Sequence, residues 1–459
     1  MFEISIPTGA KKIISLLQSN GYAAYVVGGC VRDSLLGFEP KDWDICTSAT
    51  PEEVKHCLSN RTIDTGLKHG TITVISDDDN YEVTTYRVDG NYSDNRHPDK
   101  VKFVTSLTED LARRDFTINA MAYNDTDGLV DKFGGITDLE HKRISCVGEP
   151  DDRFAEDALR ILRAMRFAST YGFSIQQQTA ESIHRNKKRL DNIAYERIQT
   201  ELIRMLHGSG ILQILLNFSD VISTIIPELK PCVGFDQNNR YHQYDIYEHI
   251  SHAVSNYTGD DASVKIALLL HDIGKPLCYT EDEKGGHFHG HALPSRDLAR
   301  VVLDRLRFDN KTKAEVLELV LYHDSVIEAT PKTIRRWLAK IGEWRLRQLI
   351  AVKKADIAAH KVGTYEERLA KCDVLLSIVD EVIDKQQCFS IKNLSINGND
   401  IIKLGIPEGV AVGRVLRTLL DMVIAGEIVN ETDILKRWVS ENEQRTEKSF
   451  CKESQKERR

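Results

Sequence analysis

The stretch VVGGCVRDSLLGFEPKDWDICTS, which runs from Val26 to Ser48, decides how the N-terminal part of the chain folds. Apolar residues end at Gly28 and Gly29, and a helix-compatible segment follows, so the pattern predicts a strand, a glycine turn and a helix. Such a turn lets a phosphate approach the backbone, and Arg32 would add a planar, charged fork for its oxygens. Many Gly-Gly pairs are only turns, so the motif needs a second signal.

The second signal is the pair of aspartates that closes the stretch. If DWDICT is extended, Asp42 and Asp44 point to the same face. Two adjacent carboxylates repel each other unless a cation lies between them, and Mg²⁺ binds carboxylates together with phosphate oxygens. The sequence therefore predicts a magnesium site for phosphoryl transfer, with Asp42 and Asp44 as the catalytic residues. The alternative is a solvated pair of aspartates on an edge strand.

The whole chain is that of a soluble globular protein of several domains. It has 459 residues, of which 41% are hydrophobic and 28% charged, and a formal net charge of −8. That charge excludes a globally basic nucleic-acid binder, although a local basic face could still bind phosphates. We find no signal peptide and no apolar run of the ~20 residues that a membrane helix needs. Nine scattered cysteines favour free thiols and a cytoplasmic location, with no membrane partner.

The predicted secondary structure changes near residue 148. Before it, short β-rich runs alternate with helical segments, and GTITVI and YEVTTYR are typical of an antiparallel hairpin. After it, almost every segment is helical. We expect an α/β head and a helical body, divided into a head over 1–148, a neck over 149–230, a His- and Asp-rich domain over 231–360, a last helical block over 361–440 and a disordered charged tail over 441–459.

The motif LARRDFTINAMAYN supplies candidate ligands for a nucleotide. Arg113 and Arg114 are adjacent, so at least one is available to a phosphate or sugar. Asp115 and Asn119 are four residues apart, so on a helix they share a face and could bind a ribose hydroxyl. Alternatively, Asp115 only caps a helix that begins at Phe116.

The motif EDALRILRAMRF carries an argument about base selection. On a helix, Asp157 and Arg160 lie side by side, and Arg163 and Arg166 extend the basic strip toward the phosphates. The buried face would consist of Ala158, Ile161, Leu162 and Met165. Cytosine and adenine each present an amino donor beside a ring-nitrogen acceptor, which Asp157 and Arg160 could bind. Uracil and guanine present a carbonyl instead. The alternative is an exposed ion pair of little consequence.

Taken together, these motifs resemble the nucleotidyltransferases that build or repair the tRNA 3′ CCA end, and the related bacterial poly(A) polymerases. The resemblance covers roughly residues 20–190. It implies a nucleotidyltransferase head with a small mixed sheet, Mg²⁺ held by Asp42 and Asp44, CTP and ATP as donors and an RNA 3′-OH as acceptor. It also implies that Gly29, Arg32 and the Arg-Arg-Asp motif meet the triphosphate and ribose, and that Asp157 and Arg160 read the base.

The segment TTYRVDGNYSDNRHPDKVKF, residues 84–103, is predicted to be a long polar loop. Tyr86 and Arg87 could anchor its base. In the family, an intact loop lets the site change from C to A, and enzymes that add only CC have a shortened one. Asp89, Asp94 and Arg96 are present here, so the resemblance implies a complete CCA-adding enzyme.

A second group of motifs, including YEHISHAV and ALLLHDIGKP, resembles the HD phosphohydrolase pattern. His249, His271, Asp272 and Asp356 form the predicted metal site, with Asp324 as a rival to Asp356. His291 and His323 could bind a second divalent metal, whereas His287 and His289 could be ordinary loop histidines. In the family such a domain is associated with hydrolysis of 2′,3′-cyclic ends or phosphomonoesters, or serves as a helical body that holds tRNA.

The resulting prediction is template-independent addition of CCA to tRNA by a monomer or homodimer. The tRNA would contact a basic face that includes Arg185, Lys187, Lys188 and Arg189, although these could equally form a solvated helix face. Three alternatives remain: a poly(A) polymerase or an enzyme adding only A or only CC, a phosphohydrolase whose head only binds RNA, and a non-catalytic RNA-binding protein.

Overall fold

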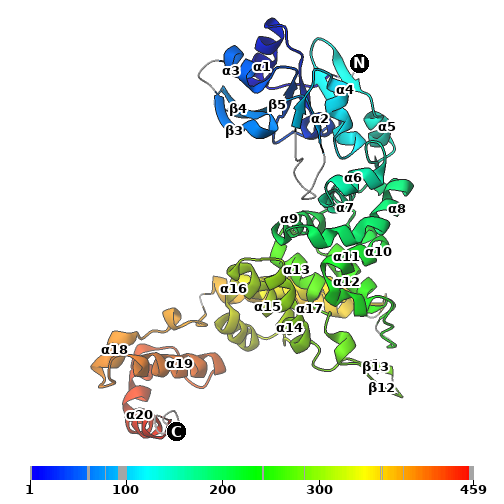
Figure 1. The fold of residues 1–459 in the computed structure, drawn as a ribbon. Helices are drawn as coiled ribbons and strands as arrows, with labels where there is room; N and C mark the ends of the chain where they lie inside the picture. Colours follow the sequence, from blue (N-terminus) through cyan, green and yellow to red (C-terminus); the bar gives the residue numbers. More distant parts are fainter. Residues whose placement is uncertain are drawn as a thin grey trace. The chain divides into compact units, whose positions relative to one another are not determined.

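The structure, a computed structural model, describes residues 3–453 except 59–61, 78, 91–100, 240–241, 284, 362, 364 and 386, and it leaves the side chains of 65, 68, 89 and 443–453 undescribed. The chain forms two compact units (Figure 1). Unit 1 comprises Met1–Gly234 and Arg300–Asp309, and unit 2 comprises Phe235–Ala299 and Asn310–Arg459. The predicted head and neck thus belong to one unit.

The head is built on a seven-stranded sheet with the order β3-β4-β5-β2-β1-β8-β9. Its strands are β1 (Ala24–Val27), β2 (Ile45–Thr47), β3 (Thr62–Gly66), β4 (Thr71–Ser76), β5 (Asp79–Thr85), β8 (Met121–Asn124) and β9 (Gly128–Asp131). The β2–β5 pairing is parallel and the other pairings in this sheet are antiparallel, so the expectation of a mixed sheet is confirmed. The predicted hairpin is confirmed as β4 and β5, in which Ile72 faces Val83.

Helices and a buried cluster hold this sheet in place. The helices of the head are α1 (Thr8–Ser19), α2 (Gly29–Leu35), α3 (Pro51–Leu58), α4 (Leu107–Ala112) and α5 (Gly135–Glu140). A core cluster joins β1, β2 and β8 to α4 and consists of Val27, Cys46, Tyr86, Leu111, Ala120, Ala122 and Val147. The glycine turn therefore lies directly against a packed core.

The neck is mostly helical, as predicted, with one short parallel pair of strands, β10 (Arg143–Ile144) and β11 (Ser174–Ile175). Its helices are α6 (Pro150–Glu156), α7 (Leu159–Tyr171), α8 (Gln177–Asn186), α9 (Tyr195–Leu206), α10 (Ile211–Asn217) and α11 (Ser219–Ile225). The buried face predicted for α7 is confirmed, because Ala158, Ile161, Leu162 and Met165 are all fully buried.

One prediction about helices was wrong, and one alternative does not apply. The single helix expected through EDALRILRAMRF breaks at Asp157, which has φ −139° and ψ 104° between α6 and α7. Its carboxylate accepts a hydrogen bond from the backbone N–H of Leu159, as aspartates do at helix starts. No α-helix begins at Phe116 among the described residues: this residue is extended and bridges to Cys146, and only the 3₁₀ helix η2 (Thr117–Asn119) follows.

Two of the hydrophobic clusters described in unit 2 are separate from each other. Its helices are α12 (Ile246–Asn256), α13 (Ala262–Leu270), most of α14 (Ala292–Arg305), α15 (Asn310–Tyr322), α16 (Pro331–Ala358), α17 (Glu366–Asp384), α18 (Gly398–Lys403), α19 (Val410–Ala425) and α20 (Thr432–Glu453). Helices α16 and α17 share one core, and the second core begins at Cys388. The domain boundary predicted after residue 360 thus falls within the first core.

The predicted disordered tail is partly helical, since α20 continues to Glu453. The Glu, Lys, Arg and Gln residues of this segment favour a helix even without an apolar face, which explains the difference. Among the described residues, no helix combines the length and the apolar character needed to cross a bilayer.

Candidate functional site

The glycine turn has the geometry that the sequence predicts. Gly28 adopts φ 81°, a conformation that glycine favours, and links β1 to α2. A Cβ on Gly28 would lie 3.0 Å from Nη1 of Arg114, and one on Gly29 would lie 3.5 Å from Nη2 of Arg32. Two guanidinium groups therefore lie beside the turn, where they can attract an anion.

Three carboxylates lie near this turn. Asp42 and Asp44 immediately precede β2 and are both exposed, and the carbonyl of Asp44 accepts from the backbone N–H of Val27 at 3.0 Å. Because β2 pairs in parallel with β5, with Ile45 opposite Val83, Glu82 lies next to Asp44. The sequence reasoning missed Glu82, and the only signal for it was a charged residue inside a strand.

The electrostatics of these carboxylates favour a bound cation. Although the Asp44 side chain reaches solvent, the protein packed around it raises the pKa of its carboxyl, and the charges of Glu82 and Asp42 raise it further. Arg114 opposes this shift. A cluster of oxygen donors with excess negative charge is the kind of site that binds Mg²⁺.

A buried aspartate positions the two adjacent arginines. Asp110 is 0% exposed, and its Oδ1 accepts from Arg113 at 2.8 and 3.0 Å, while its Oδ2 accepts from Arg114 at 3.3 Å. The backbone N–H of Arg87 also donates to Asp110, at 3.3 Å. Asp110 was not predicted from the sequence, because its position next to both arginines depends on the end of α4.

Asp115 and Asn119 do contact each other, although no α-helix joins them. Nδ2 of Asn119 donates to Oδ1 of Asp115 at 3.0 Å, and Arg163 donates twice to Oδ2, at 2.9 and 2.6 Å. Burial alone would raise the pKa of Asp115, but Arg163 and Asn119 outweigh it and hold that pKa well below its usual range. Arg32 donates in turn to Oδ1 of Asn119, so one network links the glycine turn to α7.

Arg32 and Arg166 are more buried than the sequence suggested. Arg32 is 7% exposed, pairs with Asp33 at 2.9 Å and lies over the rings of Phe167 and Tyr171. Arg166 is 9% exposed, and its Nε lies 2.5 Å from Glu201. The strip predicted along α7 is therefore interrupted at Arg166.

Asp157 and Arg160 each have a protein partner of their own. Asp157 accepts from Nη2 of Arg197 at 2.9 Å. Arg160 donates to Glu156 at 2.5 Å and to the backbone carbonyl of Arg113 at 3.1 Å. The two candidate base readers are thus fixed by contacts that connect them to α6, α9 and the arginine motif.

The loop predicted over residues 84–103 is shorter than expected, because β5 continues to Thr85 and the two ends of the segment pair as strands β6 (Arg87–Asp89) and β7 (Val101–Phe103). Tyr86 is fully buried and Arg87 donates to the carbonyl of His69, so the prediction that both anchor the loop base is confirmed. Asp94, Arg96 and the side chain of Asp89 lie outside the described residues.

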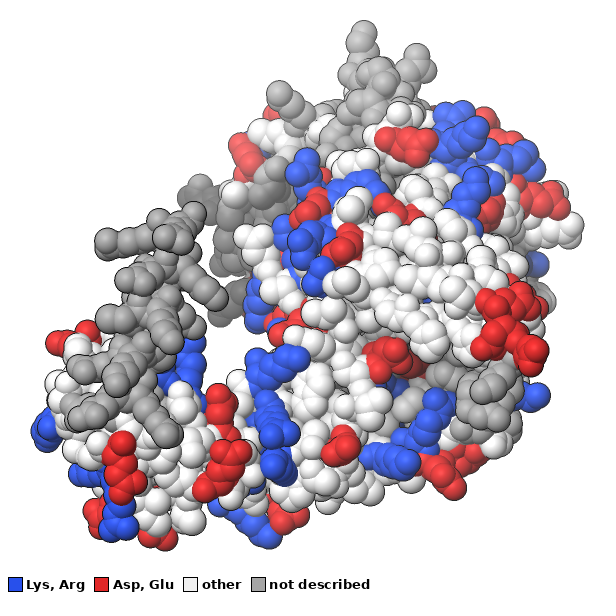
Figure 2. Space-filling view, turned by 90° about the horizontal axis from the view of Figure 1, so that it is seen from below, with Lys and Arg blue, Asp and Glu red and all other residues white. Residues whose placement is uncertain are grey.

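The basic sequence RNKKR is largely paired within the neck. Arg185 lies 3.1 Å from Asp151, Lys187 lies 2.6 Å from Asp220, and Arg189 donates to Asn186 at 2.8 Å. Lys188 is exposed. On the face shown in Figure 2, basic and acidic side chains are interspersed and only short basic runs occur.

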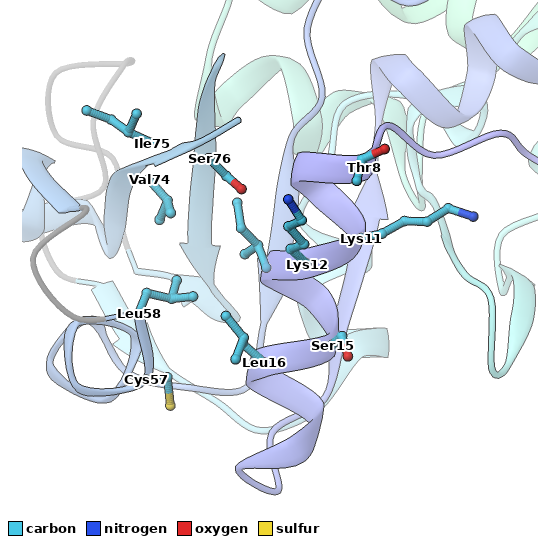
Figure 3. A pocket seen from close by; sticks show the side chains of 11 residues that line it. Thr8, Lys11, Lys12, Ser15, Leu16, Cys57, Leu58, Val74, Ile75 and Ser76 are labelled. Atoms are coloured by element: carbon cyan, nitrogen blue, oxygen red, sulfur yellow. The ribbon is translucent and has the colours of Figure 1, made fainter. Parts of the chain in front are cut away.

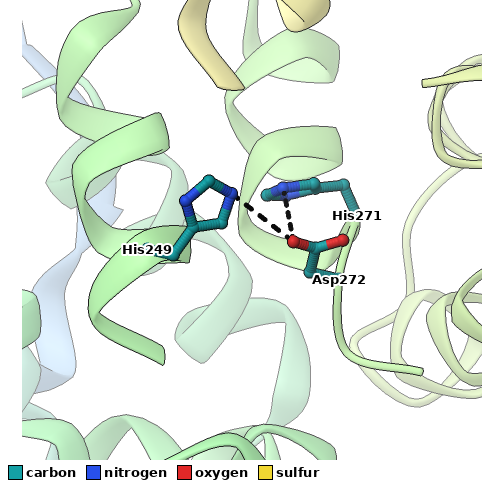
Figure 4. Close-up of side chains that lie close together, drawn as sticks. All are labelled: His249, His271 and Asp272. Atoms are coloured by element: carbon teal, nitrogen blue, oxygen red, sulfur yellow. Dashed lines mark ion pairs between the residues drawn. The ribbon is translucent and has the colours of Figure 1, made fainter. Parts of the chain in front are cut away.

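Unit 2 brings the predicted histidines and aspartates into one buried cluster. Figure 4 shows His249 and His271 beside Asp272, with Nε2 atoms 3.5 and 3.1 Å from its Oδ2. The other oxygen, Oδ1, lies 3.1 Å from Nε2 of His291 and 3.5 Å from Nε2 of His323. Asp272 therefore faces two groups of imidazoles, each of which could hold a metal ion.

Asp356 closes this cluster. Its Oδ1 lies 2.9 Å from Nε2 of His249 and 3.6 Å from Nε2 of His271. Its rival Asp324 is exposed and lines an adjoining cavity of about 240 Å³. His289 lines the same cavity, whereas His287 pairs with Asp282 at 2.9 Å.

The imidazole tautomers fit a metal. Nδ1 of His271, His291 and His323 each face a backbone carbonyl, at 2.7, 2.8 and 2.7 Å. A carbonyl only accepts, so these Nδ1 atoms carry protons and the Nε2 lone pairs point into the cluster. The Nε2 atoms of His291 and His323 are 3.0 Å apart and would repel each other without a cation between them.

The pKa values of the histidines in this cluster reflect a balance between burial and the nearby carboxylates. Burial alone would lower the pKa of His271, but Asp272 and Asp356 raise it to about 10. Burial lowers the pKa of His249 to about 4 despite its contact with Asp356. The carboxylates that raise the pKa of His271, those of Asp272 and Asp356, are the ones that would attract a cation to this cluster.

A larger cavity, of about 630 Å³, lies elsewhere in the head, between α1, α3 and β4 (Figure 3). Leu16, Leu58, Val74 and Lys12 are among the residues that line it. None of the candidate site residues lines this cavity. Its size therefore does not make it the active site.

Comparison with known families is consistent with this division of the chain. A family profile described as "Poly A polymerase head domain" matches residues 24–145. A second, described as "Probable RNA and SrmB- binding site of polymerase A", matches residues 172–232, and a third, described as "HD domain", matches residues 241–382.

Whole-length relatives share one name. A Levilactobacillus brevis protein named CCA-adding enzyme is 46% identical over 433 residues, 93% of this chain and 96% of its own. A Limosilactobacillus fermentum protein of the same name is 34% identical over 429 residues, 93% of this chain and 94% of its own.

Solved structures show the same fold. The Bacillus stearothermophilus CCA-adding enzyme in complex with CTP has a TM-score of 0.70 and 29% identity, and the match covers 96% of this chain and 98% of that one. The Thermotoga maritima CCA-adding enzyme complexed with tRNA has a TM-score of 0.62 at 21% identity over 94% of each chain.

Proposed function

The chain belongs to the family of CCA-adding enzymes, which are nucleotidyltransferases, and on that premise we propose that it adds CCA to tRNA 3′ ends from CTP and ATP without a nucleic-acid template. The observation that carries the proposal is the set of three carboxylates, Asp42, Asp44 and Glu82, beside the glycine turn and Arg114. Scattered free thiols support a cytoplasmic location.

In the proposed reaction, the RNA 3′-OH attacks the α-phosphate of the nucleotide in line, and pyrophosphate leaves. Asp42, Asp44 and Glu82 would hold Mg²⁺, because exposed oxygen donors with excess negative charge suit this hard cation. When bound, Mg²⁺ supplies the charge that activates the attacking oxygen and stabilises the leaving one.

The arginines of the head would bind the triphosphate. Arg113 and Arg114 are oriented by Asp110, and Arg114 lies over the glycine turn. Arg32, whose guanidinium lies beside Gly29, contributes a further positive charge. Asp115, held by Arg163, and Asn119, which donates to Asp115, would fix the ribose.

Asp157 and Arg160 would select the base. A carboxylate accepts from the amino group of cytosine or adenine, and a guanidinium donates to the ring nitrogen. Uracil offers a carbonyl where the amino group stands, so Asp157 disfavours it. The contacts of Arg160 with Glu156 and the Arg113 carbonyl support this role, because they hold its guanidinium in one orientation.

The test is extension of a tRNA that lacks its 3′ CCA, with Mg²⁺ and CTP, ATP or both, analysed by product length. Addition of three nucleotides with CTP and ATP, and no more, supports CCA addition. A long ladder with ATP alone would indicate a poly(A) polymerase, and a stop after CC a partial enzyme. The Asp44→Asn variant is expected to lose extension, and Arg160→Ala to lose selection of C and A over U.

A second activity is favoured by the cluster around Asp272. We propose that unit 2 hydrolyses phosphoesters with divalent metals held by His249, His271, Asp272 and Asp356, and by His291 and His323. Imidazole and carboxylate ligands suit a transition metal, which when bound lowers the pKa of water and supplies hydroxide. Each oxygen of Asp272 faces its own imidazole pair, which supports a two-metal arrangement.

This activity can be tested separately with the full-length protein, p-nitrophenyl phosphate and bis-p-nitrophenyl phosphate, in Mn²⁺, Co²⁺, Ni²⁺ or Mg²⁺. Asp272→Asn is expected to abolish hydrolysis and to leave CCA addition intact. Asp42→Asn should have the opposite effect. Hydrolysis that survives Asp272→Asn would overturn the assignment to unit 2.

A further inference from the structure

Helix α9 makes an ion pair with one of the two residues that we propose read the base. Oδ2 of Asp157 accepts from Nη2 of Arg197 at 2.9 Å, and Oδ1 accepts from the backbone N–H of Leu159 at 2.9 Å. One oxygen is therefore held by the start of α7, and the other by a neighbouring helix.

Arg197 is built into the neck rather than free on its surface. Its side chain is 23% exposed and that of Asp157 is 16% exposed. One turn later on α9, Glu201 pairs with Arg166 of α7 at 2.5 Å. Between and beyond these charges, α9 buries Ile198, Leu202 and Met205. Two ion pairs of opposite polarity thus fix α9 against the segment that carries Asp157.

The backbone of Asp157 does not fix its side chain by itself. The residue lies at the break between α6 and α7, where the chain is extended. The hydrogen bond to Leu159 holds one oxygen but leaves the plane of the carboxylate free to tilt around it. The second bond, from Arg197, defines that plane and so determines where the remaining lone pairs point.

We propose that Arg197 is a positioning residue that determines base specificity by orienting the Asp157 carboxylate toward the amino group of the incoming C or A. The inference rests on the proposed function, in which Asp157 reads that amino group. A carboxylate has about four lone-pair sites, so two remain for the base after the bonds to Leu159 and Arg197.

The effect of Arg197 is confined to one half of the base reader. Arg160, the donor half, is held by Glu156 and the Arg113 carbonyl and has no bond to Arg197 among the described contacts. Loss of Arg197 should therefore slow the incorporation of CTP and ATP, which both carry the amino group. The incorporation of UTP, which lacks that group, should not become slower. A hydrogen bond to a charged group corresponds to roughly a ten- to hundredfold change in kcat/KM.

The experiment compares single-turnover incorporation of CTP, ATP and UTP on a tRNA lacking CCA by the wild type, Arg197→Met, Arg197→Lys and Asp157→Asn. Arg204→Met is the matched control, because Arg204 is exposed on the same helix. We expect Arg197→Met to lower the preference for C over U about tenfold or more. Arg197→Lys should restore part of it, and Arg204→Met should not change it.

The readouts separate the possible failures. Equal slowing of all three nucleotides by Arg197→Met, with a lower Tm, would show a merely structural role and overturn the inference. An unchanged preference in Arg197→Met, with a reduced one in Asp157→Asn, would also overturn it. An unchanged preference in Asp157→Asn would instead refute the base-reading assignment itself. In the double variant Arg197→Met, Asp157→Asn, the effects on the preference for C over U are expected to be non-additive, since both residues act through one contact.

Discussion

Oδ2 of Asp115 lies 2.6 Å from Nη2 of Arg163, and this contact joins the head to the helix that carries the base-reading residues. Asp115 is 8% exposed, so its charge depends on this partner and on Asn119. The pair ties the position of α7 to η2, and η2 to the glycine turn through Arg32 and Asn119. The nucleotide-binding elements of the head and neck therefore act as one frame.

Arg163→Met should loosen this frame, because it leaves a buried carboxylate without its cation. Breaking a buried pair costs about 3–5 kcal/mol, and the partial exposure of Arg163 reduces the expected loss to about 2 kcal/mol. The measurement is hydrogen exchange, which should accelerate in η2 and the first turns of α7. Arg189→Met, at an exposed site, is the control. Unchanged protection in Arg163→Met would contradict the structural role of the pair.

The same pair predicts a pH dependence. The pKa of Asp115 in the folded protein lies below that of an unfolded aspartate, about 3.9, so the carboxylate contributes stability above that value. This contribution is lost as the pH falls through the folded-state pKa. In acid titrations followed by the exchange of η2, the wild type should show this loss, and Arg163→Met should show a smaller one.

The raised pKa of Asp44 predicts how Mg²⁺ binding depends on pH. The charges of Glu82 and Asp42 add to burial in raising the pKa of Asp44, so a proton competes with a metal ion at higher pH than at an ordinary aspartate. The apparent affinity for Mg²⁺ should consequently fall as the pH is lowered, beginning above about pH 4. The measurement is the Mg²⁺ dependence of nucleotide addition at a series of pH values.

Glu82→Gln should lower kcat about a hundredfold, or about 2.7 kcal/mol of transition-state stabilisation. It should leave tRNA affinity unchanged, because Glu82 lies with the carboxylates and not on the neck. Glu109→Gln, on the exposed side of α4, is the matched control. Normal kcat in Glu82→Gln at saturating Mg²⁺ would remove Glu82 from the site.

Local sequence patterns predicted the elements that depend on local chemistry. The glycine turn, the β4–β5 hairpin and the apolar face of α7 all follow from residue spacing over a few turns or strands. These three elements needed no knowledge of how distant segments meet. The cluster around Asp272 joins distant segments, and it was predicted from the resemblance to the HD phosphohydrolase pattern, which several residues match in order.

The missed residues depend on distant contacts. Glu82 joins the aspartates because β2 pairs in parallel with β5, which no local pattern indicates. The break at Asp157 was missed since its helix-compatible neighbours hide a side-chain cap. Arg197 reaches Asp157 only through the packing of α9 on α7. Each case requires tertiary structure, whereas the residue types alone suggested solvated charges.

Asp110→Asn should impair nucleotide binding. The buried carboxylate holds both Arg113 and Arg114, so its loss frees two guanidinium groups, of which that of Arg114 lies beside the glycine turn. We expect KM for CTP and ATP to rise about tenfold or more for each, with the preference for C over U preserved. Steady-state kinetics with each nucleotide measure this. A change in preference without a change in KM would contradict it.

Metal binding at the cluster around Asp272 should stabilise unit 2. A ligand that binds only the folded state adds about 2.7 kcal/mol at a hundred times its Kd, so Mn²⁺ or Co²⁺ should raise the unfolding temperature of the wild type and EDTA should lower it. Hydrogen exchange of α12 and α13, which carry or adjoin His249 and His271, locates the effect.

Substitutions in the two ligand groups of Asp272 should remove the bound metal ions separately. His323→Gln removes a ligand only from the group near Oδ1, so the Mn²⁺ or Co²⁺ bound by unit 2, measured by elemental analysis, should fall from two ions to one. Asp272→Asn affects both ligand groups and should abolish metal binding by the cluster. His287→Gln, which changes a histidine paired with Asp282 outside the cluster, should keep both ions. One ion in the wild type, unaffected by His323→Gln, would restrict the centre to His249, His271, Asp272 and Asp356.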